Sequence, residues 1–145
     1  MSQYFDIGDE TLWNPSDGTS RMFQRQVVVF EAELELPSGI GPMESDECQI
    51  SPEALETFVN ALLAEHRRTS HAIWLALSEG FTATVLVLAE RSGINVDWAR
   101  HEATPDRLED VQASTGSGMS APAQGEVWAA GLREKAQELG RRMPR

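Results

Sequence analysis

One long apolar segment, residues 71–91, limits what this chain can fold into more than any other feature. Apart from His71 at its start, Glu79 is its only acidic or basic residue before Glu90 and Arg91. A helix that is apolar on every side must be buried, either in a protein core or in a membrane. The apolar run from Trp74 to Ala89 is shorter than the roughly 20 residues of a membrane span, and a charge near its middle opposes insertion. We therefore predict a buried core helix.

A second helix is predicted directly before this one, over residues 51–68. Its start, Ser51-Pro52-Glu53, combines a capping residue, a proline suited to the first turn and an acid at the positive end of the helix dipole. Only Thr69-Ser70 separates it from the core helix, so the two must form an antiparallel helical hairpin. Gly93 stands where the core helix is expected to end.

The N-terminal region predicts a hairpin and then a segment that fits two structures. Residues 4–13 contain two short apolar strands around Gly8-Asp9, which suits a type II′ turn. Residues 19–36 fit a helix, with an apolar residue every three or four positions from Phe23 to Leu34, or a strand that alternates from Val28 onward. We favour the helix, because the segment is too long for an ordinary strand.

The rest of the chain has weaker signals. Residues 37–49 hold two prolines and two glycines and are predicted to be a loop. Residues 104–113 predict a short helix, 114–125 a flexible linker, and 126–142 an amphipathic helix. We expect a mostly α fold, a compact bundle of four to five helices with a short N-terminal β-hairpin. Its single domain would cover residues 1–113, and the C-terminal part, 126–145, would dock on this domain or on a partner.

The charge of the chain is strongly uneven. Its formal net charge is −11, and residues 1–57 contain twelve Asp and Glu against two Arg. A nucleic-acid-binding protein needs a basic surface, and an acidic N-terminal part would be repelled by anionic lipid. A basic protein is the complementary partner, because opposite fields steer association. The alternative is that the acids only keep the protein soluble.

The sequence has no feature of an exported or disulfide-bonded protein. Cys48 is the only cysteine, and the first residues lack the basic and apolar regions of a signal peptide. No motif for a cofactor, a metal ion or a phosphate group is found. We expect a cytoplasmic protein that uses no cofactor and binds neither nucleic acid nor membrane.

Glu79 is the candidate chemical group. Its helical neighbours three and four positions away are Leu, Ala and Thr, so we expect it to face packed structure. A buried carboxylate must be paired or protonated, and it could then act as a general acid or base or bind a polar ligand. The structural alternative is an ion pair with Arg21, Arg25 or a backbone group.

Glu44, Asp46 and Glu47 form an acidic group in the loop beside Cys48. The alternatives for this group are a solvated loop, a contact with a partner and a site for a hard cation. Its spacing matches no calcium-binding loop. The acidic neighbours would also raise the pKa of Cys48, which argues against a nucleophilic thiol.

Trp128, Leu132 and Leu139 lie on the single apolar stripe of the C-terminal helix. A helix with one such stripe behind a linker must dock on its own domain, on a twin subunit or on another protein. These three residues are therefore candidates for partner binding. The partner could be a second copy of the chain, in a homodimer whose subunits exchange their tails.

Several short motifs in the first 95 residues or so resemble a small, uncharacterised actinobacterial protein family, a domain of unknown function. The resemblance leaves the tail of the chain outside. It implies a bacterial origin and transfers no catalytic residue. The motifs that carry it are Leu12-Trp13-Asn14-Pro15-Ser16, Leu36-Pro37-Ser38-Gly39-Ile40-Gly41-Pro42-Met43, Asp46-Glu47-Cys48 and Glu79-Gly80-Phe81-Thr82-Ala83-Thr84.

Two functions of different kinds follow as hypotheses. The first is a non-enzymatic interaction module whose acidic part covers a basic protein, as an immunity protein or an antitoxin does. The second is a small helical ligand-binding protein or enzyme of specialised metabolism with Glu79 in a pocket.

Overall fold

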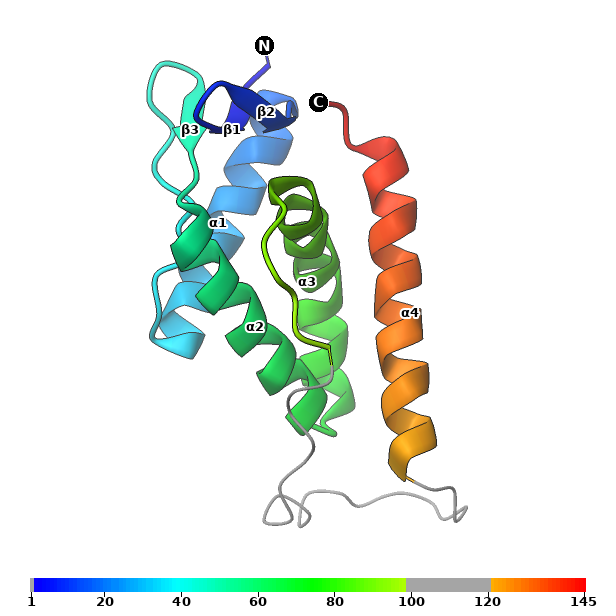
Figure 1. Cartoon of the computed structure of the whole chain (residues 1–145). Coiled ribbons are helices and arrows are strands. Elements are labelled where there is room, and N and C mark those ends of the chain that lie inside the picture. Colours follow the sequence, from blue (N-terminus) through cyan, green and yellow to red (C-terminus); the bar gives the residue numbers. More distant parts are fainter. Residues whose placement is uncertain (1, 99–120) are drawn as a thin grey trace.

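The computed structural model describes residues 2–98 and 121–145 and contains four helices and a small three-stranded sheet within them (Figure 1). The mostly α class with a short strand element is confirmed. The helix predicted at residues 104–113 lies outside the described residues. In chain order the elements are β1 (Tyr4–Ile7), β2 (Glu10–Trp13), α1 (Asp17–Leu34), β3 (Glu47–Gln49), α2 (Pro52–Arg68), α3 (Ala72–Ser92) and α4 (Ala121–Arg142).

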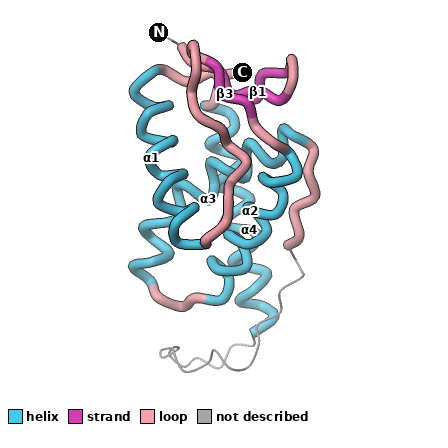
Figure 2. The backbone as a smooth tube through the Cα atoms, turned by 90° about the vertical axis from the view of Figure 1, so that its left-hand side faces the viewer, coloured by secondary structure: helices cyan, strands magenta, loops and turns pink. Residues whose placement is uncertain are grey.

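The sheet has the order β2-β1-β3 and lies at one end of the molecule (Figure 2). β1 and β2 form the predicted antiparallel hairpin, and Gly8 in its turn has a φ of 60°, which glycine adopts without strain. β3 pairs with β1 in parallel, so the expectation that all of residues 37–49 are loop was wrong for residues 47–49. Three residues are too few to show a period, and their partner strand lies about 40 positions earlier in the chain.

The segment 19–36, whose sequence fits either a helix or a strand, belongs mainly to the helix α1. Ser16 begins it, because its side-chain oxygen accepts a hydrogen bond from the backbone N–H of Thr19 at 3.4 Å. The rings of Phe23 and Phe30 both stack on Phe81 of α3, with centroids 5.7 and 4.4 Å apart. The helical spacing thus puts both rings on one side of α1, which an alternating strand would not do at a separation of seven residues.

Helices α2 and α3 form the predicted antiparallel hairpin (Figure 1). α2 buries five apolar side chains toward α3 and the rest of the core, and Phe58 meets Phe81 edge-on with centroids 6.5 Å apart. α3 ends at Gly93, whose φ of 76° is the left-handed conformation typical of a helix C-terminus.

α3 is buried along only part of its length. Phe81 and the residues from Val85 to Ala89 are in the core, but Ile73 and Leu77 in its first half are 63% and 76% exposed. The expectation of an evenly buried core helix was therefore wrong for the first half. α3 is long and apolar enough by composition to cross a membrane, and half of the stretch concerned is buried inside the fold.

α4 packs on α3 of its own chain. Leu132 and Ala136 are buried at this contact, and Met143 is buried just beyond the helix. The helix starts at Ala121, so it includes residues 121–125, which we expected to be part of the linker. Both ends of the described chain lie at the sheet end of the molecule (Figure 1).

Arg91 holds the end of α4 in place. Its guanidinium donates to the carbonyl of Leu12 at 2.7 Å, of Gly140 at 2.9 Å and of Met143 at 3.0 Å. Burial lowers the pKa of Arg91, with a further contribution from Arg145. One side chain of α3 thereby links β2 to the last turn of α4, where a cation is favoured by the helix dipole.

Candidate functional site

The predicted acidic loop is an ordered hairpin turn, which we call the acidic hairpin (residues 44–47). Glu44 and Glu47 exchange two backbone hydrogen bonds, of 2.8 and 3.0 Å. The two residues between them, Ser45 and Asp46, have φ values of 53° and 68°. Positive φ at both central positions defines a type I′ turn, whose twist suits a tight antiparallel turn.

The sheet fixes the acidic hairpin on its other side. The backbone N–H of Tyr4 donates to the carbonyl of Asp46 at 2.9 Å, and Gln3 Nε2 donates to Asp46 Oδ1 at 3.3 Å. Glu47 itself belongs to β3. The carboxylates are therefore mounted on backbone that the sheet orders.

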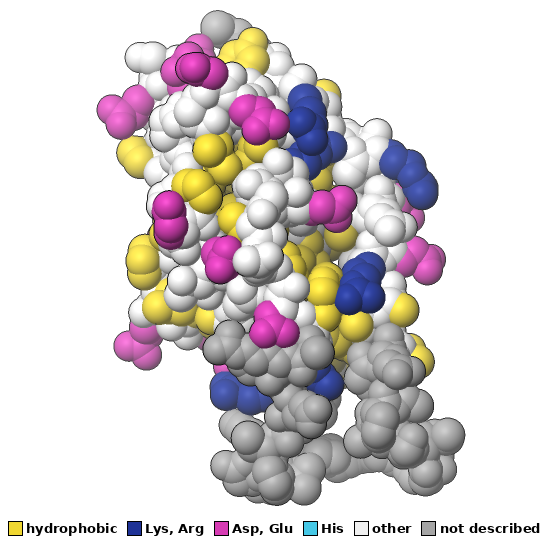
Figure 3. Space-filling view, in the orientation of Figure 1, with side chains coloured by type: hydrophobic (Ala, Val, Ile, Leu, Met, Phe, Trp, Pro, Cys, Tyr) yellow, Lys and Arg dark blue, Asp and Glu magenta, His cyan; other side chains and the backbone are white. Residues whose placement is uncertain are grey.

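No residue in the described part of the chain neutralises the acidic hairpin. Glu44 and Glu47 are exposed and Asp46 is half-buried, and none of the three forms an ion pair with any described residue. Glu10 of the same sheet pairs with Arg145 at 3.7 Å. On the face seen in Figure 3, acidic side chains predominate toward the sheet end and the side opposite α4, whereas Lys and Arg lie mainly toward α4 and the lower end.

Trp128 packs against other residues of its own chain. Its indole Nε1 donates to His66 Nδ1 of α2 at 2.9 Å, and its ring lies 6.0 Å from that of Trp98. Arg67 lies 5.9 Å over the same ring. Leu132 is fully in the core, and Leu139 is half-buried at the edge of a groove between α1 and α4. These contacts place the tail stripe against residues of its own chain.

His66 is buried in this contact. Burial lowers its pKa, and the opposing effect of Glu79 is smaller. Because Nδ1 accepts the indole hydrogen bond, the proton of the neutral ring is on Nε2, which has no partner among the described residues.

Glu79 is a surface residue. Its side chain is about half exposed and its Oε1 lies 3.4 Å from Lys135 Nζ. The expectation that it faces packed structure was wrong, and so was an ion pair with Arg21 or Arg25. It lies in the exposed first half of α3, where α4 passes beside it.

Cys48 is a core residue without nucleophilic character. It is fully buried, and its Sγ donates to the carbonyl of Gly41 at 3.2 Å. Burial raises its pKa to about 11, so the thiol is protonated at neutral pH. Asp6 of β1 contributes in the same direction.

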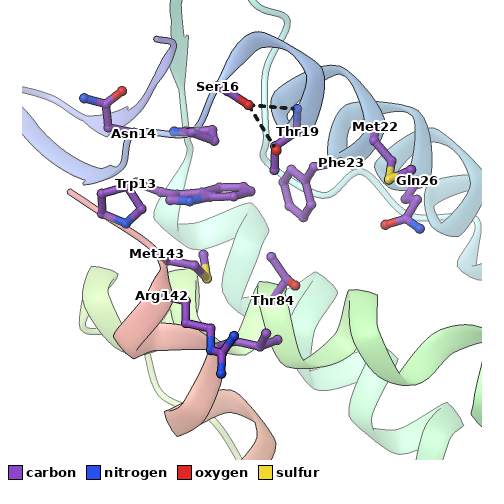
Figure 4. Close-up of a pocket in the computed structure, with 13 residues that line it drawn as sticks. Trp13, Asn14, Ser16, Thr19, Met22, Phe23, Gln26, Thr84, Arg142 and Met143 are labelled. Atoms are coloured by element: carbon purple, nitrogen blue, oxygen red, sulfur yellow. Dashed lines mark hydrogen bonds between the residues drawn. The ribbon is translucent and has the colours of Figure 1, made fainter.

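A groove between α1 and α4 is the feature that sequence reasoning missed (Figure 4). Its volume is about 420 Å³, and Thr84 of α3 lies between the two helices. Arg142 is its only charged lining residue and pairs with Glu138 at 3.6 Å. The other lining residues are Trp13, Asn14, Pro15, Ser16, Thr19, Met22, Phe23, Gln26, Leu139, Met143 and Pro144.

Of the six residues predicted to bind a partner, Leu139 alone lines this groove. The groove brings together positions more than 100 residues apart in the chain, so no local pattern announces it. Within residues 2–98 and 121–145, no group of three or more His, Cys, Asp or Glu side chains is placed to hold a metal ion.

Comparison with known proteins gives a family without an assigned activity. A family model, "Family of unknown function (DUF6086)", matches residues 1–145. The match includes the tail, so the resemblance, which stopped near residue 95, was too short. No curated protein and no solved structure matches the chain.

Proposed function

We propose that this chain, which belongs to the family of unknown function DUF6086, is a non-enzymatic interaction module that binds a basic protein through its acidic hairpin. The observation that carries the proposal is that three acidic side chains stand on an ordered turn of the backbone. Glu44, Asp46 and Glu47 stand on a turn fixed by backbone hydrogen bonds, and no described residue neutralises them.

Preorganised charge favours binding, because little conformational entropy is lost when the partner arrives. The exposed carboxylates also keep their hydration until then, and an incoming Lys or Arg replaces water rather than an existing partner. A net charge of −11, carried mostly by residues 1–57, adds long-range steering of a basic protein toward this end.

The kind of partner follows from the same chemistry. A basic enzyme that acts on nucleic acid presents a positive surface to phosphate, and an acidic protein can cover that surface. An immunity protein or antitoxin acts in this way. The alternative, a ligand-binding protein or enzyme with Glu79 in a pocket, has less support, because Glu79 is paired with Lys135 at the surface.

The test compares two triple variants of equal net charge. The first, Glu44→Gln, Asp46→Asn and Glu47→Gln, neutralises the acidic hairpin and keeps its shape, since Asn tolerates the left-handed conformation. The matched control is Glu53→Gln, Glu90→Gln and Glu134→Gln, which neutralises three exposed acids elsewhere.

We expect a basic protein to be retained from lysate by the wild type and by the control. Titration of the purified partner should show about ten-fold or weaker binding for the hairpin variant, and the loss should shrink as salt is added. The proposal fails if no basic protein is retained, or if both triple variants bind it equally.

A further inference from the structure

The outer face of α1 is uncovered and apolar at its centre. Met22, Val28 and Val29 are 66%, 64% and 55% exposed. They are exposed because the core residues of α1, Phe23 among them, occupy the opposite side of the helix. In Figure 2, α1 runs along the edge of the molecule. Three large apolar side chains on one solvent-facing helix are characteristic of a contact surface.

Apart from Asp17 in the first turn, the charges on this face are divided between the two halves of the helix. Arg21 and Arg25 are exposed in the first half, and Glu33 and the C-cap residue Glu35 are exposed at the other end. None of these four side chains forms an ion pair with a described residue. Arg21 and Arg25 are also the only basic residues among the first 57.

This arrangement is complementary to itself when the helix direction is reversed. Rotation by a two-fold axis beside Val28 and Val29 brings Arg21 and Arg25 of one copy opposite Glu35 and Glu33 of the other. The valines would meet at the axis. The dipoles of two antiparallel helices also attract each other. A two-fold contact uses the same surface on both subunits, so it requires this kind of self-complementarity.

We propose that the chain forms a two-fold symmetric homodimer through the outer face of α1, with α1 antiparallel to its copy. A shallow hollow of about 410 Å³ on the same face would receive side chains of the other copy. It is lined by Gly18, Arg21, Met22, Arg25, Gln26 and Val29. The two arginines disfavour a basic partner here, so this surface is distinct from the acidic hairpin and does not depend on the function proposed for it.

Charge reversal tests the pairing directly. Arg21→Glu with Arg25→Glu makes both halves of the face acidic, and Glu33→Arg with Glu35→Arg makes both halves basic except for Asp17 in the first turn. Each double variant alone should dimerise at least about ten-fold more weakly than the wild type, because attraction becomes repulsion. Mixing the two should give a heterodimer, and the quadruple variant, which keeps the net charge, should recover the wild-type dimer. Sedimentation equilibrium and light scattering measure the masses, and circular dichroism confirms that each variant is folded.

A control separates local from overall charge. Arg68→Glu with Arg141→Glu changes the net charge as much as the first double variant does, at exposed sites on α2 and α4. It should leave the dimer within about two-fold of the wild type. A wild type that remains monomeric up to about 100 µM would overturn the proposal. So would a dimer that both α1 double variants leave intact, or a quadruple variant that is not restored.

Cysteine cross-linking locates the axis independently of charge. Under mild oxidation Val28→Cys should form a covalent dimer, because the two copies of this position meet at the axis. Val127→Cys, at a position on α4 that is at least as exposed, should not. Cys48 is fully buried and does not interfere. Equal cross-linking of the two variants would mean random collision and would count against the α1 interface.

Discussion

At the scale of single residues, Arg91 makes several of the contacts that join the N-terminal and C-terminal parts of the chain. Its three hydrogen bonds go to carbonyls of β2 and of the last residues of α4. Two of these carbonyls, those of Gly140 and Met143, lie at the C-terminal end of α4, where the last carbonyls of a helix lack intrahelical partners. Arg91 is one of the eleven arginines of the chain, and the sequence shows nothing that distinguishes it.

Arg91→Met keeps much of the apolar stem and removes the donors. We expect a loss of about 2 kcal/mol in the free energy of unfolding, because charged donors are removed from partly buried carbonyls. The exposed Arg141→Met should change it by less than about 0.5 kcal/mol. Urea unfolding followed by circular dichroism measures both. Similar values for the two variants would show that the Arg91 contacts contribute nothing specific.

His66 makes the stability of the fold depend on pH. Its pKa in the folded chain is lowered, chiefly by burial, so the unfolded chain binds more protons once the pH falls below the ordinary value of about 6.5. The contribution of neutral His66 is therefore present above that value and is lost as the pH falls through the lower folded pKa. Protonation also removes the lone pair that accepts the Trp128 hydrogen bond.

The test is a pH series of urea unfolding from pH 8 to pH 5. The wild type should lose stability over the acidic part of this range, and His66→Gln should lose the part of the slope that this histidine contributes. His71→Gln, at an exposed position, is the control and should follow the wild type. If His66→Gln has the wild-type slope, other groups account for the pH dependence.

At the scale of elements, the packing of α4 on α3 determines whether the tail is part of the fold or free to bind a partner. Leu132 is only 2% exposed against α3, and Val127 on the same helix faces solvent. Leu132→Ala should cost about 2–4 kcal/mol of unfolding free energy, because it leaves a cavity at this contact. Val127→Ala should cost less than about 0.5 kcal/mol. Equal effects in thermal or urea unfolding would show that α4 is not docked in solution.

The predictions for individual elements succeeded where the signal was local. The α2–α3 hairpin follows from a two-residue connection and strong end signals, and the β1–β2 hairpin from a glycine at its turn. α1 was ambiguous because both periods were present, and its contact with Phe81 resolves it. β3 was missed because its partner, β1, is brought to it by the intervening helix.

The uneven burial of α3 also depends on contacts between segments that are distant in the sequence. Composition shows how apolar a helix is, but only the neighbouring helices determine which turns they cover. Ile73 and Leu77 are as apolar as Leu86 and Leu88, yet the first two are exposed and the last two are buried. Glu79 lies in the exposed part, so the argument for a chemical site at this residue depended on packing that the fold does not provide.

At the scale of the whole molecule, two surfaces with opposite requirements can be distinguished. The acidic hairpin presents carboxylates that no described residue pairs with, and it is the surface that we propose for a basic protein. The outer face of α1 presents both signs of charge around an apolar centre and suits its own copy. A dimer would carry two acidic hairpins, and linked sites increase the apparent affinity for a partner with more than one basic site.

The sequence by itself determined the mostly α class, the two hairpins, the acidic character of the N-terminal part and the position of the acidic group in the chain. These depend on period, turn chemistry and charge, which are properties of neighbouring residues. Only the tertiary structure decided that Trp128 meets His66, that Arg91 closes the end of α4, that Glu79 is at the surface and that α1 has an uncovered face. Each of these depends on which segments pack together across the chain, and that packing is settled by the burial of the whole set of apolar side chains at once.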